Sequence, residues 1–277
     1  MKPKVIILRT AGTNCDQETA FAFQSSGADV DCVHINEILN AGKFLKDYHI
    51  LALPGGFSYG DDIASGRVLA NELILRAGEE IYEFIQAKKL VIGICNGFQV
   101  LAKCGLLPGP LAIEKIRAKE ICQDVTLSHN DSAKFEDRWV HLKVEGHSVW
   151  TRDAASVIFL PVAHGEGKFI AGKEAMLKDL EKNGQAAFRY CSPEGKAPQY
   201  PQNPNGSQND IAGITDKTGR ILGLMPHPER HFLFTQHPYW TRLPKKVHGD
   251  GAKIFENGVN YVKKYFKSQG HNVTKSQ

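Results

Sequence analysis

A cysteine lies between two glycines in the stretch Gly93-Ile94-Cys95-Asn96-Gly97, directly after an apolar run over residues 90–94. A short strand, a sharp turn and then a helix match a nucleophile elbow with Cys in the place of Ser. The glycines permit close backbone packing, and the nearby helix N-terminus favours a thiolate. Cys95 is therefore a candidate nucleophile for acyl transfer. The alternative is a buried core cysteine that chance glycines flank.

The best-placed of the eleven histidines is His227, in the stretch GLMPHPER. Pro226 and Pro228 bracket it, and a residue that precedes proline favours extended backbone. Side chains two residues apart then point the same way, so Glu229 could accept the ring N–H of His227 and fix its tautomer. A cysteine nucleophile needs such a base. Without Cys95, a solvated histidine and a surface glutamate would be the favoured interpretation.

Acyl transfer also needs hydrogen-bond donors for the oxyanion. In an elbow, one donor is the backbone N–H of the next residue, here Asn96, and the other comes from a neighbouring strand-end loop. The stretch LPGGFSYGD suits the second role because Gly55 and Gly56 leave the backbone N–H unobstructed. We expect Gly56 and Asn96 to be the donors, with Gly55 and Gln99 beside them in the oxyanion and substrate-binding region.

Three other residues have weaker claims on the chemistry. Cys15 lies in a strand-end loop and could contact substrate or partner, although a spectator thiol is the favoured interpretation. His164 and Glu166, in AHGEG, are interpreted as pocket or interface residues. No group of His or Cys residues has the spacing of metal ligands, so we expect no metal site.

The bulk composition of the 277 residues is ordinary, with 42% apolar residues, 23% charged residues and a net charge of +4. Scattered basic residues do not indicate nucleic-acid binding. No run is long enough for a secretory signal or a membrane span, so we expect a cytoplasmic protein without a membrane role. The six cysteines form no CxxC pair, which favours free thiols.

The elements that must position these residues alternate in type along the first half of the chain. Four short apolar runs predict buried strands, at 5–8, 30–35, 49–53 and 90–94, and the amphipathic stretch 67–89 predicts a helix between the last two. Such alternation predicts an α/β fold, with a mostly parallel central sheet and helices on both faces. The loops at the carboxyl ends of its strands would form the site.

The second half is expected to add peripheral β-hairpin elements and a closing helix over 252–267. Strands are expected at 140–144 and 158–162, and a hairpin joins 211–215 to 221–225 through DKTG. Segments 192–208 and 234–250 look like surface insertions, for which partner docking and inert decoration are equally open. We expect a single domain over 1–267 and a polar, disordered C-terminal tail over 268–277.

With these motifs in hand, the sequence resembles the class I (triad) glutamine amidotransferases, which have a flavodoxin-like fold. More narrowly, it resembles the glutaminase subunits of phosphoribosylformylglycinamidine synthases. The narrower resemblance rests on RTAGTNCDQET, LPGGFSYGDD, GICNGFQ, VAHGEGKF, NPNGSQNDIAGI and GLMPHPER, which occur in that order. One departure is Ala11, where proline is expected; it removes no reacting group.

The resemblance implies roles for these residues and for partners. Cys95 would be the nucleophile on L-glutamine, His227 the general base and acid, and Glu229 its orienting partner. Ammonia would pass to a large synthetase subunit, with a small third subunit in the same complex. ATP and magnesium would be used by that partner, because this chain has no GxxxxGK[ST] match, and no cofactor is expected in this subunit.

Two other interpretations compete with a glutamine amidotransferase. Cysteine hydrolases and chaperones of the DJ-1/PfpI type share the sheet and the elbow, but they commonly place histidine directly after the cysteine, where this chain has Asn96. A binding subunit with an inactive site is disfavoured because Cys95, His227 and Glu229 are all competent residues.

Overall fold

The computed structural model describes residues 1–41, 44–109, 112–146 and 148–273. Strands and helices alternate through the first hundred residues, and strands dominate the second half. The strands are β1 (Lys4–Arg9), β2 (Asp29–His34), β3 (Ile50–Leu53), β4 (Leu90–Ile94), β5 (Val125–Ser128), β6 (Glu136–Val144), β7 (Val157–His164), β8 (Lys168–Ala171), β9 (Ala186–Cys191), β10 (Ile211–Thr215) and β11 (Ile221–Leu224). The α-helices are α1 (Asp16–Ser25), α2 (Ile35–Ala41), α3 (Arg67–Gln86), α4 (Asn96–Lys103), α5 (Ile113–Arg117), α6 (Glu174–Lys182) and α7 (Ala252–Val273).

Nine strands form one sheet in the order β2-β1-β3-β4-β11-β10-β9-β6-β7. The five strands from β2 to β11 are parallel to one another. Because parallel strands carry their carboxyl ends to one edge, the loops after β1, β3, β4 and β11 meet there. These loops contain the residues that the sequence singles out for chemistry.

The strands from β10 to β7 continue the same sheet in antiparallel pairs. The predicted α/β fold is confirmed, and so is the hairpin between β10 and β11. The strands expected as peripheral elements, however, extend the central sheet, and only β5 and β8 form a separate small sheet within the described part of the chain.

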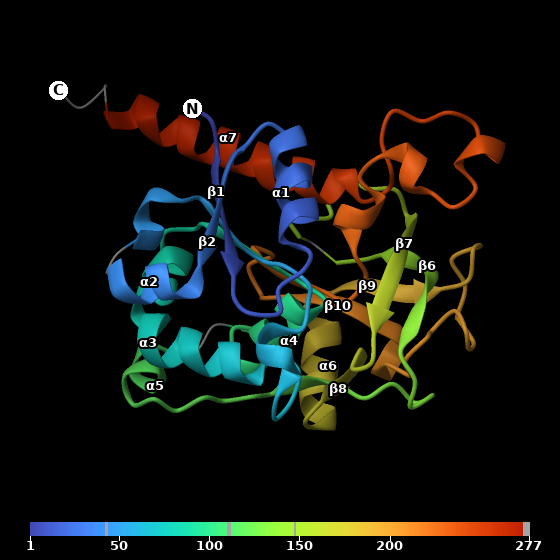
Figure 1. Cartoon of the computed structure of the whole chain (residues 1–277), viewed down its shortest axis with the longest axis horizontal. Coiled ribbons are helices and arrows are strands. Elements are labelled where there is room, and N and C mark those ends of the chain that lie inside the picture. The colour runs from blue at the N-terminus through green and yellow to red at the C-terminus, as the bar shows by residue number, and fades with distance from the viewer. Residues whose placement is uncertain (42–43, 110–111, 147, 274–277) are drawn as a thin grey trace.

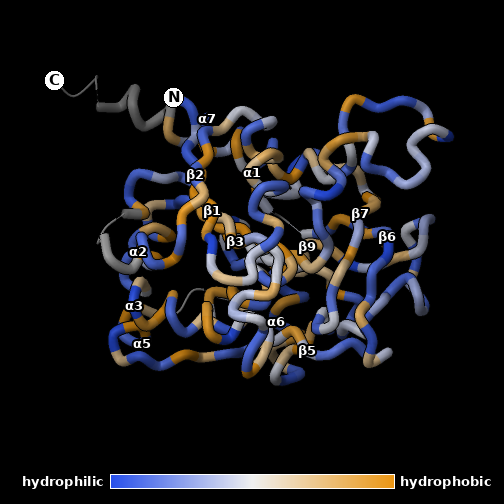
Figure 2. Tube along the Cα trace, viewed as in Figure 1, coloured by the Kyte–Doolittle hydropathy of each residue, from blue (hydrophilic) through white to orange (hydrophobic). Residues whose placement is uncertain are grey.

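Helices cover both faces of the parallel half. Figure 1 shows α1 and α7 together on one side of the strands, with α3 and α5 on the other. The rings of Phe23 in α1 and Phe255 in α7 meet edge to face, with centroids 4.9 Å apart. Helix α3 buries the predicted apolar stripe, which includes Leu69, Leu73 and Ile81. Because helices cover both faces, side chains on both faces of β1, β3 and β4 are buried, and these strands are apolar along nearly their whole length, as Figure 2 shows for β1 and β3.

Several boundaries differ from the predictions. The closing helix is present, but it ends at Val273 rather than at 267, so it includes residues 268–273 of the expected tail. Its apolar stripe stops at Phe266, and a polar continuation has no periodic signal. Residues 274–277 lie outside the described residues. Segment 192–208 is not wholly a surface insertion, because Asn205 and Ser207 are buried.

Candidate active site

The elbow after β4 has the backbone strain typical of a nucleophile turn, although the Cys95 side chain itself is largely buried. Cys95 has φ 52° and ψ −106°, a conformation that L-residues rarely adopt outside functional turns. Its backbone N–H donates to Leu224 O across the sheet at 2.8 Å. The chain then enters α4 at Asn96. The predicted order of strand, turn and helix is therefore present around the cysteine.

The two glycines of the elbow are required by close backbone contacts. A Cβ on Gly97 would lie 1.9 Å from Leu53 O, and one on Gly93 would lie 2.5 Å from Gly97 O. Neither backbone neighbour can move like a flexible side chain. Strand β4, helix α4 and the end of β3 can approach this closely only because no side chain stands at these positions.

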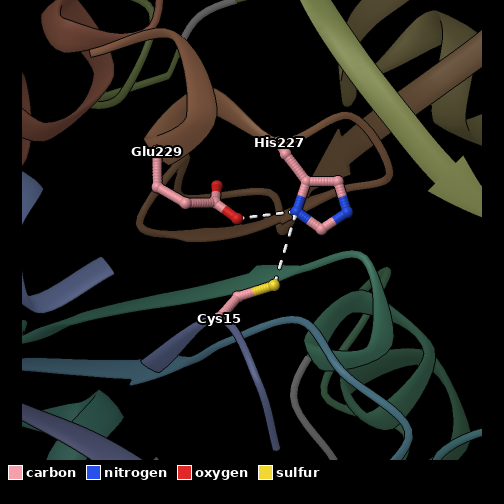
Figure 3. A group of neighbouring side chains, drawn as sticks. All are labelled: Cys15, His227 and Glu229. Atoms are coloured by element: carbon pink, nitrogen blue, oxygen red, sulfur yellow. Dashed lines mark hydrogen bonds and ion pairs between the residues drawn. The ribbon is translucent and has the colours of Figure 1, made fainter. Parts of the chain in front are cut away.

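The loop after β11 brings the histidine and the glutamate to the same edge. His227 Nδ1 lies 2.6 Å from Glu229 Oε1, and both side chains are buried. Figure 3 shows the carboxylate approaching the ring from one side. Nδ1 therefore donates to Glu229, which leaves Nε2 as the nitrogen free for proton transfer. Nε2 has no hydrogen-bond partner within the described part of the chain.

Charge keeps this imidazole protonated. Burial alone would lower the pKa of His227, but the charges of Glu229 and Cys95, together with the nearby sulfurs of Cys15 and Cys95, raise that pKa well above its ordinary range. The resting site thus favours an imidazolium, which is the form that can give a proton to a leaving amine.

The cysteine and the histidine converge on Gly55. A Cβ on Gly55 would lie 2.8 Å from His227 Cε1 and 3.5 Å from Cys95 Cβ. The Cys95 sulfur contacts Ala163 O at 3.7 Å. Residues 95 and 227, which are far apart in the sequence, therefore lie at the same end of neighbouring strands β4 and β11.

The predicted oxyanion residues surround the same point. Gly56 lines a cavity of about 230 Å³ together with Cys95. The N–H of Asn96 is in the first turn of α4, where backbone donors have no partner within the helix. The side chain of Asn96 accepts from Ser58 N–H at 3.2 Å and donates to Asp61 Oδ1 at 3.0 Å, so it ties α4 to the loop after β3.

Gln99 lines the cavity, and both ends of its amide are hydrogen-bonded to the protein. Its Nε2 donates to Glu166 O at 2.6 Å, and its Oε1 accepts from Asn96 Nδ2 at 2.9 Å. Gln99 therefore helps to hold the cavity wall, and these two bonds use one of its two amide hydrogens and one of its two oxygen lone pairs. The full lining is Gly56, Phe57, Asp61, Ser65, Cys95, Gln99, His129, Phe135, Ala163, His164, Gly165 and Glu166.

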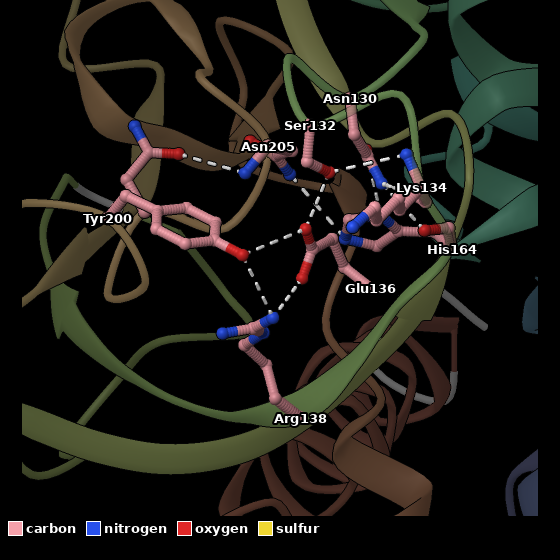
Figure 4. Close-up of polar contacts among 9 residues, drawn as sticks. Asn130, Ser132, Lys134, Glu136, Arg138, His164, Tyr200 and Asn205 are labelled. Carbon is pink, nitrogen blue, oxygen red and sulfur yellow. Dashed lines mark hydrogen bonds and ion pairs between the residues drawn. The ribbon is translucent and has the colours of Figure 1, made fainter.

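His164 is a buried, neutral part of this wall. Burial, with the charge of His227, lowers the pKa of His164 to about 3. Its Nδ1 lies 3.1 Å from Asn130 Oδ1 and its Nε2 lies 3.5 Å from Asn205 Nδ2, which is consistent with a ring that donates to the first and accepts from the second. Figure 4 shows this group beside the contacts of Glu136 with Ser132, Arg138 and Tyr200. As predicted, His164 and Glu166 line the pocket.

Comparison with known proteins agrees with this geometry. A family model described as the CobB/CobQ-like glutamine amidotransferase domain matches residues 2–262. The chain belongs to this glutamine amidotransferase family.

Relatives and a solved structure narrow the similarity within this glutamine amidotransferase family. A phosphoribosylformylglycinamidine synthase subunit PurQ from Dehalococcoides mccartyi is 46% identical over 265 residues, which cover 95% of this chain and 98% of that protein. A subunit of the same name from Methanococcus maripaludis is 42% identical, with 95% of this chain and 98% of that protein covered. A chain in the structure of PurLQS from Thermotoga maritima matches with a TM-score of 0.70 at 31% identity, covering 95% of this chain and 100% of that one. These findings confirm the fold class and the predicted resemblance, and they give no support to the DJ-1/PfpI alternative.

The amidotransferase site also contains a group that could in principle bind a metal ion. One ligand atom each from Cys15, His227 and Glu229 lies within 4.8 Å of the others. Arg230 Nη2, however, lies 3.2 Å from the Cys15 sulfur, and Nδ1 of His227 already donates to Glu229. A cation would meet a guanidinium charge and would have to break that hydrogen bond, so we assign no metal role to this group.

Long-range partners in this amidotransferase site have no local signal in the sequence. Arg230 reaches the Cys15 sulfur across 215 residues, and Asn205 reaches Gly167 O at 2.9 Å. Both residues lie in stretches that carry the family resemblance, GLMPHPER and NPNGS, and only that resemblance indicated them.

Among the helices of the described residues, none combines the length and the apolar character that a membrane span needs.

Proposed function

We propose that this chain is the glutaminase subunit of a phosphoribosylformylglycinamidine synthase. It hydrolyses the side-chain amide of L-glutamine to glutamate and ammonia. The ammonia serves the conversion of formylglycinamide ribonucleotide to formylglycinamidine ribonucleotide in de novo purine biosynthesis. The observation that carries the proposal is the convergence of Cys95 and the His227–Glu229 pair at Gly55, beside a cavity that Gly56 and Cys95 line, in a chain 46% identical to a subunit of that name.

In the first half-reaction, the Cys95 thiolate attacks the amide carbon of glutamine. The former carbonyl oxygen becomes an oxyanion, which the N–H groups of Gly56 and Asn96 stabilise. The C–N bond then breaks, and the amine leaves as ammonia with the proton of His227 Nε2. The products are ammonia and a glutamyl thioester on Cys95.

In the second half-reaction, water cleaves the thioester. The neutral His227 Nε2 takes a proton from the water as it attacks the thioester carbon. The oxyanion forms again in the same place, and the C–S bond breaks to release glutamate and restore the thiolate–imidazolium pair. Glu229 keeps the ring in one tautomer throughout, because its carboxylate accepts from Nδ1.

Ammonia would be consumed by a partner. The Thermotoga maritima relative was solved in a structure described as PurLQS, which supports a complex with a large synthetase subunit and a small third subunit for this chain as well. We propose that ATP and magnesium act in the synthetase and that this subunit uses no cofactor, because acyl transfer from glutamine needs only a nucleophile, a proton shuttle and oxyanion donors.

Glutamine turnover in purified protein tests the proposal. Glutamate and ammonia release should be measured with and without the large synthetase, in the wild type, Cys95→Ala and Cys191→Ala. Cys191 is also buried but lies at the end of β9, so it controls for the loss of a buried thiol. We expect release to vanish only in Cys95→Ala and to rise with the synthetase. Hydrolysis that survives Cys95→Ala would refute the assignment.

A further inference from the structure

The segment over residues 10–15, between β1 and α1, contacts both halves of the catalytic apparatus. We propose that this segment and Arg230 hold the oxyanion donor and the histidine in their working positions before any partner binds, with Cys15 as a positioning residue for both. This inference rests on the proposed glutaminase function, since it assigns the residues that align the glutaminase site.

The first half of the argument concerns the peptide between Gly55 and Gly56. Gly55 O accepts hydrogen bonds from Asn14 N–H at 3.3 Å and from Cys15 N–H at 3.2 Å. In a planar trans peptide, the N–H points opposite to the C=O. The N–H of Gly56 must therefore point away from residues 10–15, and Gly56 lines the cavity beside Cys95. The carbonyl bonds thus fix the direction of the proposed oxyanion donor.

Contacts on the far side of this peptide prevent it from turning over. Phe57 N–H donates to Gly12 O at 2.9 Å, and Thr13 pairs with Gly56 as an isolated β-bridge. Gly56 has φ 147°, and a Cβ there would lie 2.6 Å from Gly12 O. The two segments therefore run against each other, and a reversed peptide would lose its bonds to Asn14 and Cys15.

The same segment reaches the histidine through the Cys15 side chain. The Cys15 sulfur is buried, lies 3.9 Å from His227 Nδ1 and donates to Asn14 Oδ1 at 3.0 Å (Figure 3 shows the sulfur and the ring). A Cβ on Gly55 would lie 3.0 Å from this sulfur and 2.8 Å from His227 Cε1. The thiol and the imidazole therefore share the space that the missing side chain of Gly55 leaves open.

Cys15 does not act as a second nucleophile in this arrangement. Burial raises the pKa of Cys15, which keeps it a neutral thiol, whereas nucleophilic attack needs a thiolate. Its polar partners are instead structural. Arg230 Nη2 donates to the sulfur at 3.2 Å, and Arg230 Nε pairs with Glu18 of α1 at 3.3 Å. Arg230 therefore links α1, the thiol and the turn that carries His227.

The test compares Cys15→Ala, Cys15→Ser and the control Cys191→Ala in the full chain. For Cys15→Ala, we expect kcat for glutamine hydrolysis to fall about 10- to 100-fold, less than or comparable to the loss of a whole oxyanion donor, with KM changed by less than about threefold. Cys15→Ser keeps a donor and an acceptor and should recover most of the loss. The control should stay near wild type.

A second readout separates positioning from general stability. Alkylation of Cys95 by iodoacetamide is followed against pH, with peptide mass spectrometry to distinguish Cys95 from Cys15. In Cys15→Ala, the inflection at which the thiolate–imidazolium pair loses its proton should move to lower pH, because the sulfur contact favours the protonated ring. This readout needs no glutamine turnover, so it remains informative if the glutaminase assignment itself fails.

Arg230→Met covers the case in which Cys15→Ala does not fold. The Arg230 side chain is one-third exposed (33%), so its replacement should leave the fold intact. We expect kcat to fall at least fivefold with little change in KM. A kcat within twofold of wild type and an unchanged alkylation profile, in a folded Cys15→Ala or Arg230→Met chain, would overturn the proposal.

Discussion

Replacement of Glu229 by glutamine isolates the charge that sustains the catalytic pair. The carboxylate lies 2.6 Å from His227 Nδ1, and both groups are buried. A hydrogen bond to a charged group contributes roughly 1.5–3 kcal/mol, which corresponds to about 10- to 150-fold in an equilibrium constant. Loss of the charge should therefore lower the pKa of His227, because burial then acts without the opposing charge of Glu229.

Glutamine at position 229 would also weaken control of the tautomer, since its amide can donate to Nδ1 as well as accept from it. Removal of the orienting carboxylate in a comparable triad costs about 10⁴ in rate. We expect kcat/KM of Glu229→Gln at neutral pH to fall about 100- to 10,000-fold, where the pKa change supplies the smaller part and the wrong tautomer the rest. The fold should persist, because the substitution keeps the shape of the side chain.

The assay is the pH dependence of kcat/KM for glutamine hydrolysis in the wild type, Glu229→Gln and Glu79→Gln. Glu79 is a surface carboxylate whose side chain is 57% exposed, so it controls for the loss of one negative charge. The His227 inflection should move to lower pH only in Glu229→Gln. A Glu229→Gln chain with a wild-type profile and a rate within threefold of wild type would refute the reasoning.

Three further predictions concern stability and the cavity wall. In Gly97→Ala, the new Cβ meets Leu53 O, so the free energy of unfolding in urea should fall by more than about 3 kcal/mol. In the control Gly109→Ala, the new Cβ has no atom within 4 Å, and the free energy of unfolding should change by less than about 0.5 kcal/mol. Equal effects of the two substitutions would contradict the packing account. The raised pKa of His227 contributes stability that is fully present below about pH 6.5 and is lost as the pH rises through the folded-state pKa. The stability advantage over His227→Gln should therefore shrink as the pH rises above about 6.5, and a growing advantage would be inconsistent with that sign. Asn205→Ala should lower the free energy of unfolding by about 1–3 kcal/mol, because it removes a buried, hydrogen-bonded amide. It should raise KM more than it lowers kcat, because this amide supports the cavity wall and does not touch the reacting atoms. A change in kcat alone would instead indicate that Asn205 acts in the chemical step.

The parallel half of the fold was predictable because its signals are local. Strands β1, β3, β4 and β11 are short apolar runs, β2 alternates polar and apolar residues, and the turn at Cys95 carries its glycines within two residues. The His227–Glu229 contact was predicted, but for a partly wrong reason. His227 is extended, as a residue before proline favours, whereas Pro228–His231 forms a short 3-10 helix, and this helical turn brings Glu229 to the ring. These patterns are complete within one stretch of chain, so neighbouring residues suffice to read them.

The elements that the sequence did not predict, such as α6 and β9, lack such a pattern. Helix α6 has nine residues and fully buries only Leu180, with Met176 and Leu177 partly buried against the core, so its apolar stripe is too short to give a strong periodic signal. Strand β9 is nearly all buried but contains Arg189, whose guanidinium pairs with Glu145 and Glu181 from other elements. These ion pairs make an internal arginine acceptable, and they exist only once the chain has folded.

The contacts around Cys15 show the same limit at the site. Its sulfur contacts His227 and Arg230, which lie more than two hundred residues later in the sequence. From the sequence alone, a spectator thiol was therefore the favoured interpretation of Cys15. The sequence also left open whether the oxyanion donor is aligned in the free subunit. The bonds from residues 10–15 to Gly55 support alignment without a partner, so any activation by the synthetase would act elsewhere, for example on the cavity wall.

Covalent capture on the cysteine tests the central claim most directly. The purified chain is mixed with glutamine, quenched in acid within one turnover and digested, and the peptides are analysed by mass spectrometry. The account predicts a glutamyl thioester on the peptide that contains Cys95, absent in Cys95→Ala. A thioester on Cys15, or glutamine hydrolysis that continues at the wild-type rate in Cys95→Ala, would contradict it.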